Sequence, residues 1–443
     1  MERPTAPPRP AGLPLAGIRV VDLTSAVVGP YATQVLADYG AEVIKVEERS
    51  GDVIRWISGR SRTPGMSGKF MHMNRNKRSV SLDLKQPAGR EALLRLVDTA
   101  DLFLHNMRPA AIERLGLGAA TLTARHPRLV YCGVVGFGSG GRYAGRPAYD
   151  SILQGGTALA SLLGGAAGEP RYVPYVVVDR TAGLMVAHAL LAALFGRERD
   201  GAGRTIEVPM FESYVALLLG EHLYGHSFEP PTGPLGDRRL LDANARPVRT
   251  RDGHVCITTN TDAQVHQLFI ALGRPDLAAD PRFATALARI DHIAAFFALR
   301  AELLAQRDTD AVIALLLAHD IPCMPCHTLE SLLADPHLQD VGLVQPAEHP
   351  TQGSIRAIRP TVSMTGLDPT VRLPAPHIGQ HTAEVLAELG YAPDAVAALF
   401  GSGAAFADAL PDAAAESAPE PAADTAPDPT TAHPPTATGD NTP

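Results

Sequence analysis

The sequence lacks the features that mark secreted and membrane-bound proteins. Its 443 residues include only four cysteines, too few for a disulfide framework in a chain of this length. The longest apolar run, 182–196, contains a histidine and is shorter than the roughly 18–20 residues that cross a bilayer. The Pro-rich N-terminus has no apolar signal-peptide core. These absences favour a cytoplasmic protein that does not enter a membrane.

An excess of positive charge is also absent. The formal net charge is −8, and seven of the acidic residues lie in the last 40 residues, which contain no lysine or arginine. The rest of the chain has 39 basic and 40 acidic residues and is therefore almost neutral. This balance gives no indication of nucleic-acid binding. With 45% apolar and 19% charged residues, the composition is typical of a globular enzyme.

Strand and helix patterns alternate from residue 17 onward. Short β-branched runs predict strands, which alternate with segments of helical spacing, and a long apolar helix is expected at 179–198. This succession predicts an α/β fold with a mostly parallel sheet covered by helices. Composition divides the chain into a flexible Pro-rich leader (1–14), a large domain (15–225), a small α+β domain (226–325), a further folded segment (326–400) and a disordered Ala/Pro/Asp/Thr tail (401–443).

Three familiar kinds of site are not supported by the residues. The first strand-to-helix turn has only Gly29 where a dinucleotide fingerprint needs three glycines. The Gly-rich stretch 133–141 is not followed by a P-loop lysine, and close backbone packing explains it better than phosphate binding. The Cys-x-x-Cys-His motif at 323–327 lacks two further ligands at zinc spacing. No metal site is therefore predicted.

Asp179 is the carboxylate that stands out. An extended apolar run ends at this residue, and a long apolar helix begins directly after it. One interpretation is an ordinary helix N-cap. The other is a nucleophile, kept ionised by the helix N-terminus, whose backbone N–H groups are offered to a developing oxyanion. The residues alone leave both interpretations open.

Several stretches in the same chain resemble one family, the class III CoA-transferases (CaiB/BaiF type), relatives of formyl-CoA transferase and carnitine CoA-transferase. The stretches that carry the resemblance are 14–47, 74–93, 105–118, 128–164, 176–213, 321–340 and 377–391. The resemblance implies a Rossmann-like large domain built from both chain ends, with 326–400 returning to complete it, and a small α+β domain. It also implies an interlocked, ring-like homodimer.

The resemblance implies site residues as well. Asp179 matches the catalytic aspartate, which attacks an acyl-CoA thioester and carries first the acyl group and then CoA. No tightly bound cofactor is expected, because the coenzyme A thioester is a substrate, and the partners are an acyl-CoA donor and a carboxylic acid acceptor. The positions that match CoA contacts are Ala26, Val27, Val28, Leu82, Lys85, Asn106, Arg114 and Tyr149.

The chain departs from the family pattern in two places. Val27 stands where some formyl-CoA transferases have glutamine, and no Gly-rich loop is evident between 228 and 256. Both departures speak against formyl or oxalyl substrates. Arg180, next to the matched aspartate, suggests a dicarboxylic acid such as succinate.

Two other functions are open. The first is an α-methylacyl-CoA racemase, which shares this fold but needs an acid/base pair. Racemases have a histidine where this chain has Tyr149, and tyrosine is a poor base because its pKa is about 10. The second is a non-catalytic protein that binds acyl-CoA.

Overall fold

The computed structural model describes residues 12–165, 168–367 and 370–407. Most of the predicted leader and tail therefore lies outside the described residues. The strands of the structure are β1 (Arg19–Leu23), β2 (Glu42–Glu47), β3 (Lys77–Leu82), β4 (Leu102–His105), β5 (Val130–Val135), β6 (Arg204–Pro209), β7 (Val248–Arg249), β8 (His254–Ile257), β9 (Cys323–Pro325), β10 (Val344–His349), β11 (Gly353–Ile358) and β12 (Ala405–Phe406).

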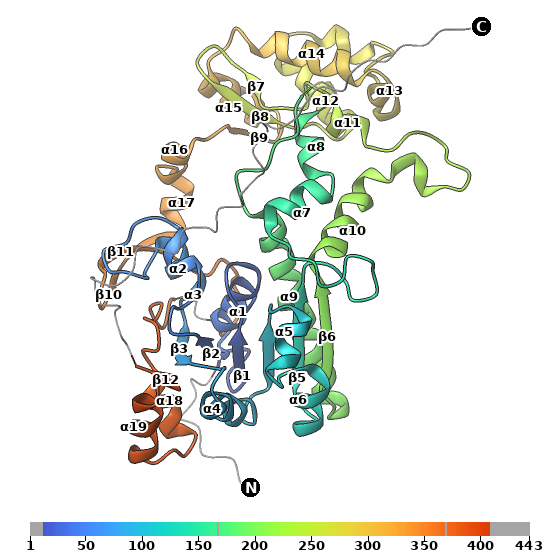
Figure 1. Ribbon diagram of the computed structural model, residues 1–443. Coiled ribbons are helices and arrows are strands. Elements are labelled where there is room, and N and C mark those ends of the chain that lie inside the picture. The colour runs from blue at the N-terminus through green and yellow to red at the C-terminus, as the bar shows by residue number, and fades with distance from the viewer. Residues whose placement is uncertain (1–11, 166–167, 368–369, 408–443) are drawn as a thin grey trace, which may run out of the picture. The chain divides into compact units, whose positions relative to one another are not determined.

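Seven of these strands form one sheet, in the order β12-β3-β2-β1-β4-β5-β6 (Figure 1). Neighbouring strands run parallel except β12, which is antiparallel to β3. This confirms the predicted α/β fold with a mostly parallel sheet. β12 joins the sheet from the C-terminal side of the chain, so the predicted start of the tail at 401 is too early.

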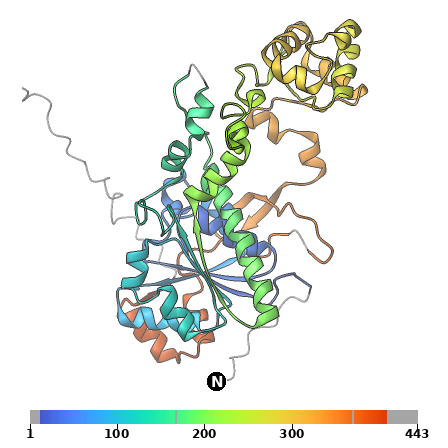
Figure 2. The same cartoon turned by 90° about the vertical axis from the view of Figure 1, so that its right-hand side faces the viewer.

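Helices cover both faces of this sheet (Figure 2). The α-helices of the described chain, not all of which cover this sheet, are α1 (Val28–Asp38), α2 (Ile54–Ile57), α3 (Gly68–Asn74), α4 (Pro87–Val97), α5 (Pro109–Arg114), α6 (Ala119–Arg125), α7 (Asp150–Gly156), α8 (Leu159–Gly164), α9 (Val177–Asp200), α10 (Met210–His222), α11 (Arg238–Leu241), α12 (Asp262–Ala271), α13 (Ala286–Asp291), α14 (Ile293–Leu304), α15 (Thr309–Ala318), α16 (Leu329–Leu333), α17 (Pro336–Asp340), α18 (Thr382–Glu388) and α19 (Pro393–Gly401).

Each face of the sheet has its own apolar core. Consecutive residues of β1 point to opposite faces, so Val20 packs with α1 and α9 whereas Val21 packs with α4, α6 and α18. Both valines are fully buried. A strand buried on both faces reads as a continuous apolar run, which is why β1 was recognisable in the sequence.

The longest helix, α9, belongs to the first of these cores. By length and composition it could cross a membrane, and 44% of its most apolar window is buried inside the protein. Val178, Val186 and Leu190 are among its buried residues and pack with strands β4 and β5. In this structure α9 is therefore partly a core helix of the α/β domain.

Residues 248–323 have a separate apolar core. It is formed by β7, β8 and β9, which make a three-stranded antiparallel sheet, together with α12, α14 and α15. Strands β10 and β11 form a further two-stranded antiparallel sheet. Residues 226–325, predicted to be a small α+β domain, thus contain both helices and short antiparallel strands.

Candidate active site

The strand order places a crevice between the carboxyl ends of β1 and β4. The chain proceeds from β1 to β2 and β3 on one side and from β4 to β5 and β6 on the other. In open α/β sheets, ligands bind outside the carboxyl ends of the strands where the order reverses in this way. The segments that follow β1 (24–28) and β4 (106–108) flank this crevice.

Three side chains from separate segments hold the backbone after β1. The Lys45 Nζ donates to the carbonyl of Thr24 at 2.8 Å. The Asn106 side chain accepts from the N–H of Ser25 at 3.0 Å and donates to its carbonyl at 2.8 Å. The Asp52 Oδ1 accepts from the N–H of Ala26 at 2.9 Å. We call residues 24–28 the clamped loop.

The clamp fixes an unfavourable backbone conformation. Ala26 has a φ of 65°, in the left-handed region that costs a non-glycine residue on the order of 1 kcal/mol or more. Such a conformation persists where the surroundings over-determine it. Asn106 was predicted to contact CoA, but both ends of its amide are paired with Ser25. In this structure the amide therefore holds the loop.

Buried charges lie beneath the clamped loop. Lys45 and Asp52 form an ion pair of 2.8 Å, and Lys77 and Asp22 one of 3.1 Å, all with almost no exposed surface. Burial alone would raise the pKa of Asp22, but the charges of Lys77 and Lys45 outweigh it and lower this pKa to about 2. Asp22 is therefore ionised at neutral pH and stays paired with Lys77.

Asp179 lies in the first turn of α9, but it is not the helix cap. The N-cap is Val176, whose side chain makes no capping hydrogen bond. The Asp150 carboxylate, at the start of α7, caps the helix instead. Its Oδ1 accepts from the N–H groups of Val178 at 2.8 Å and Asp179 at 3.1 Å, and its Oδ2 accepts from Gln154 at 2.6 Å.

This arrangement corrects two expectations about the start of α9. Burial and the nearby charge of Asp150 raise the pKa of Asp179 to about 7, so the helix N-terminus does not keep this carboxyl fully ionised. The charges of Lys69 and Arg180 act in the opposite direction. The N–H groups of Val178 and Asp179 are occupied by Asp150, so they are not available to an oxyanion.

The start of α9 packs closely against the clamped loop and α1. A Cβ atom on Gly183 would lie 2.9 Å from the carbonyl oxygen of Val28, so only glycine allows this approach. Val27 and Val176 belong to one small apolar cluster. Asp179 therefore belongs to the turn of α9, between Val176 and Gly183, that packs against the clamped loop.

A cleft of about 430 Å³ opens at the carboxyl ends of β4, β5 and β6. Its lining includes Arg108 and Arg114 together with Phe137 and Glu207. Two guanidinium groups in one cleft suit the phosphates of a nucleotide. Arg114 was one of the predicted CoA contacts, and Arg108 was missed, although it lies only two residues after Asn106.

The remaining predicted contacts are scattered over the same end of the domain. Leu82 ends β3 and is buried, so its side chain is part of the core. Lys85 is exposed directly after that strand. Tyr149 is the N-cap of α7 and is 72% exposed. Tyr149 directly precedes Asp150, a residue to which the sequence pattern did not point.

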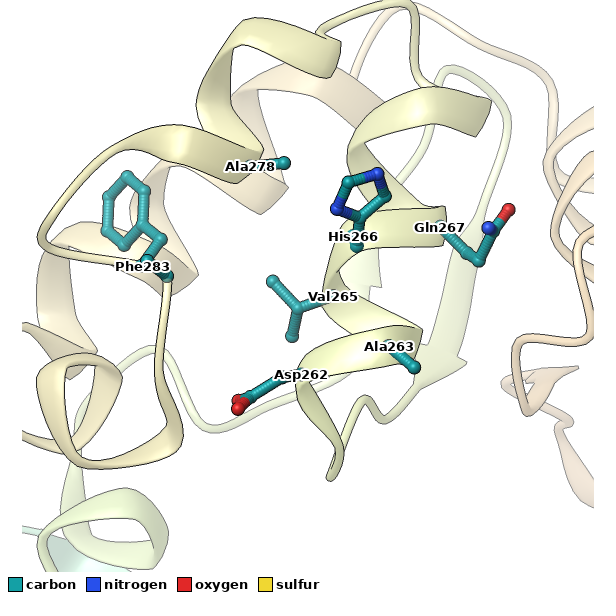
Figure 3. A pocket seen from close by; sticks show the side chains of 8 residues that line it. Asp262, Ala263, Val265, His266, Gln267, Ala278 and Phe283 are labelled. Atoms are coloured by element: carbon teal, nitrogen blue, oxygen red, sulfur yellow. The ribbon is translucent and has the colours of Figure 1, made fainter.

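A second cavity, of about 340 Å³, lies in the segment around α12. Figure 3 shows Val265 and His266 on α12 with Phe283 across from them. Asp262 lines the same cavity, but its carboxylate is paired with Arg289 at 2.7 Å. The lining contains none of the predicted site residues, so this cavity is not the candidate site.

Comparison with known proteins assigns the chain to a family. The sequence profile of "CoA-transferase family III" matches residues 15–382. A succinate–glutarate CoA-transferase from Agrobacterium fabrum is 33% identical over 85% of this chain and 96% of its own. A formyl-CoA:oxalate CoA-transferase from Escherichia coli is 31% identical over 87% of this chain and 98% of its own.

Solved structures give the same assignment. A crystal structure of Rv3272 from Mycobacterium tuberculosis superposes with a TM-score of 0.74 at 32% identity, over 84% of this chain and 99% of that one. A CaiB/BaiF family protein from Brucella suis superposes with a TM-score of 0.72 at 31% identity, over 85% and 100%. The chain therefore belongs to CoA-transferase family III and is an enzyme of that family.

Proposed function

We propose that Asp179 is the nucleophile that moves CoA from an acyl-CoA donor to a carboxylic acid. The main support is its carboxyl group, which makes no hydrogen bond or ion pair within the described residues and is carried by the turn of α9 that packs against the clamped loop. A carboxylate held in an ion pair would be a poor nucleophile. With a pKa of about 7, Asp179 is ionised in a large fraction of molecules at neutral pH and is more basic than an ordinary aspartate.

The reaction balances without ATP. The Asp179 carboxylate attacks the donor thioester, which forms a mixed anhydride and expels CoA thiolate. The thiolate attacks the Asp179 carbonyl, which gives an aspartyl-CoA thioester and releases the donor acid. The acceptor carboxylate attacks this thioester, which forms a second anhydride and again expels CoA thiolate. The thiolate then attacks the acceptor carbonyl, which gives the new acyl-CoA and restores Asp179.

The start of α1 supplies donors for the thioester oxygen. The backbone N–H groups of Val27 and Val28 have no hydrogen-bond partner in the part of the chain that the structure describes. They lie in the clamped loop, next to the turn that carries Asp179. Donors fixed in advance are what a developing oxyanion needs, and their fixation explains why the loop is held at Thr24, Ser25 and Ala26.

The cleft with Arg108 and Arg114 is the proposed site for the CoA phosphates. Lys85, exposed after β3, and the backbone near Leu82 would contact the adenosine end, and Tyr149 would contact the pantetheine side of the crevice. Asn106 contributes by holding Ser25. The Ala26–Val28 segment then lies beside the thiol.

The substrates are proposed from the relatives and from Arg180. Both curated relatives described above act on dicarboxylic acids or their CoA esters, by their names. Arg180 follows Asp179 directly and offers a positive charge for a second carboxylate. Succinyl-CoA is therefore the proposed donor, in a cytoplasmic reaction, with another carboxylic acid as acceptor.

We also propose that the working form is an interlocked homodimer. Met210 is the only buried residue of α10, although this helix is predominantly apolar. Leu217 and Leu219 are 50% and 41% exposed, and Leu184 and Phe195 on α9 are 50% and 65% exposed. Several exposed apolar side chains on two helices that contact each other are typical of an interface, and a second copy of the chain would cover them.

The proposal is tested by incubating the protein with succinyl-CoA and a panel of carboxylic acids. Hydroxylamine is added to trap activated acyl groups, and the modified peptide is mapped by mass spectrometry. The expected result is a new acyl-CoA in solution and a modification at Asp179. If no thioester and no adduct form, while solvent deuterium enters the α-position of a branched acyl-CoA, the enzyme is a racemase and the proposal is wrong.

A further inference from the structure

Two cations near Asp179 have no polar partner in the described chain. The Arg180 guanidinium lies over the ring of Tyr31, 4.3 Å from its centroid, and its Nε atom is buried without a hydrogen-bond partner. The Lys69 side chain, on α3, makes no hydrogen bond or ion pair within the described residues. A buried donor such as the Arg180 Nε is costly unless something pairs with it.

Packing brings both cations to the same place. Phe70 and Met73 of α3 share a small apolar cluster with Val27 of the clamped loop and Val176 at the start of α9. Lys69 therefore stands beside the turn that carries Asp179. Its charge acts on the Asp179 carboxyl, as does that of Arg180. Within the described residues neither cation forms an ion pair with this carboxyl, so each cationic nitrogen lies more than 4.0 Å from its oxygens.

The surrounding charges do not neutralise this pair. The Asp150 carboxylate is engaged by the N–H groups of α9 and by Gln154. His72, the other titratable group of α3 near Arg180, has its pKa lowered by burial and by the charges of Arg75 and Arg180, so it is neutral at pH 7 and adds no charge. When Asp179 is converted to an anhydride or thioester it also loses its charge. The carboxylate charge on which Lys69 and Arg180 act is then gone.

We propose that Arg180 and Lys69 form a subsite for the distal carboxylate of a dicarboxylic acid, which stays ionised while the other carboxylate reacts at Asp179. This inference rests on the proposed role of Asp179. A monocarboxylic acid has no charge to place there. Because neither cation contacts the Asp179 carboxyl, the two carboxylates of the substrate must be separated by intervening carbons, as in succinate or glutarate but not in oxalate.

The test compares two donors that differ in the distal carboxylate. Succinyl-CoA and butyryl-CoA are given separately to the full-length enzyme, and kcat/KM is measured for formation of the hydroxylamine-trapped Asp179 adduct. We expect the wild type to prefer succinyl-CoA. Arg180→Met and Lys69→Met should each lower kcat/KM for succinyl-CoA by about 10–100-fold while changing that for butyryl-CoA by less than about 3-fold. Arg180→Lys should retain part of the preference.

The control is Arg199→Met, which removes an exposed arginine at the far end of the same helix. It should leave both donors unchanged. If either cation variant loses both donors equally, or neither loses the preference for succinyl-CoA, the subsite is wrong. If the wild type forms no adduct with either donor, the proposed function fails instead. Should Arg180→Met not fold, Lys69→Met carries the test alone.

Discussion

At the scale of single residues, the site depends on two aspartates from different helices. Asp150 caps α9, and its charge, together with burial, sets the pKa of Asp179. The sequence pointed to Asp179 because an apolar run ends at it and a long helix follows. The sequence did not reveal the raised pKa of the Asp179 carboxyl, because Asp150 lies 29 residues away and contacts Asp179 only in the folded chain.

The first prediction concerns Asp150→Asn. This variant keeps an oxygen that can accept from the N–H groups of α9 but removes the charge that raises the pKa of Asp179. Lys69 and Arg180, which lower that pKa, remain. For the wild type, kcat/KM for the donor should rise with pH through a midpoint near 7. The variant's midpoint should lie about one pH unit lower.

Asp200→Asn, at the exposed end of α9, is the matched control and should leave the midpoint in place. An unchanged midpoint in Asp150→Asn would mean that Asp150 does not set the ionisation of Asp179.

The second prediction concerns Asp179→Asn. Because the folded-state pKa of Asp179 is raised to about 7, the folded protein binds a proton more tightly than the unfolded chain. Folding stability is therefore lost as pH rises from about 4 to about 7. The asparagine variant should abolish CoA transfer and raise Tm. The gain should be about 2–4 °C larger at pH 8 than at pH 4 in thermal unfolding. A gain that is equal at both pH values would contradict the raised pKa.

At the scale of elements, the mostly parallel sheet and the long helix follow from the sequence pattern, with a helix expected at 179–198 and α9 found at Val177–Asp200. The pattern missed α3, α19 and β12. The seven residues of α3 show no clear period, and β12 is a two-residue strand defined only by its partner β3. The sequence pattern also could not show the clamped loop, because the residues that hold this loop come from β2, from residue 52 and from the end of β4.

The third prediction tests the clamp with Asn106→Ala. The variant loses both hydrogen bonds to Ser25, so the N–H groups of Val27 and Val28 lose their fixed position. We expect kcat to fall by about 10–100-fold, with a smaller change in KM for the donor. Steady-state kinetics over a range of acyl-CoA concentrations separate the two parameters. A large increase in KM with unchanged kcat would instead make Asn106 a direct CoA contact.

The fourth prediction concerns the buried charges under this loop. Lys45→Met removes the partner of Asp52 and leaves a buried carboxylate without its cation. The free energy of unfolding should fall by about 3–5 kcal/mol, measured by chemical denaturation. Lys85→Met, which changes an exposed lysine after β3, should leave the stability within about 0.5 kcal/mol of the wild type. A similar small effect for Lys45→Met would show that the pair contributes little.

At the scale of the whole molecule, the sequence resemblance predicted the family, and the sheet and comparisons confirm it. The homodimer stays a prediction, and the exposed apolar residues of α9 and α10 are its support. Leu217→Glu should weaken the proposed interface, because a charge placed in apolar contact is not compensated. Light scattering should then show monomers where the wild type shows dimers. Leu287→Glu, which changes an exposed leucine on α13, should leave the assembly unchanged.

The most direct test of the account follows one oxygen atom. In the proposed reaction Asp179 gives one carboxylate oxygen to the departing donor acid and takes one from the acceptor. A single turnover of unlabelled succinyl-CoA with glutarate labelled with 18O should therefore leave one 18O atom in the peptide that contains Asp179, a mass gain of about 2 Da. If the new acyl-CoA forms while the peptide that contains Asp179 carries no 18O, the covalent role of this residue is contradicted.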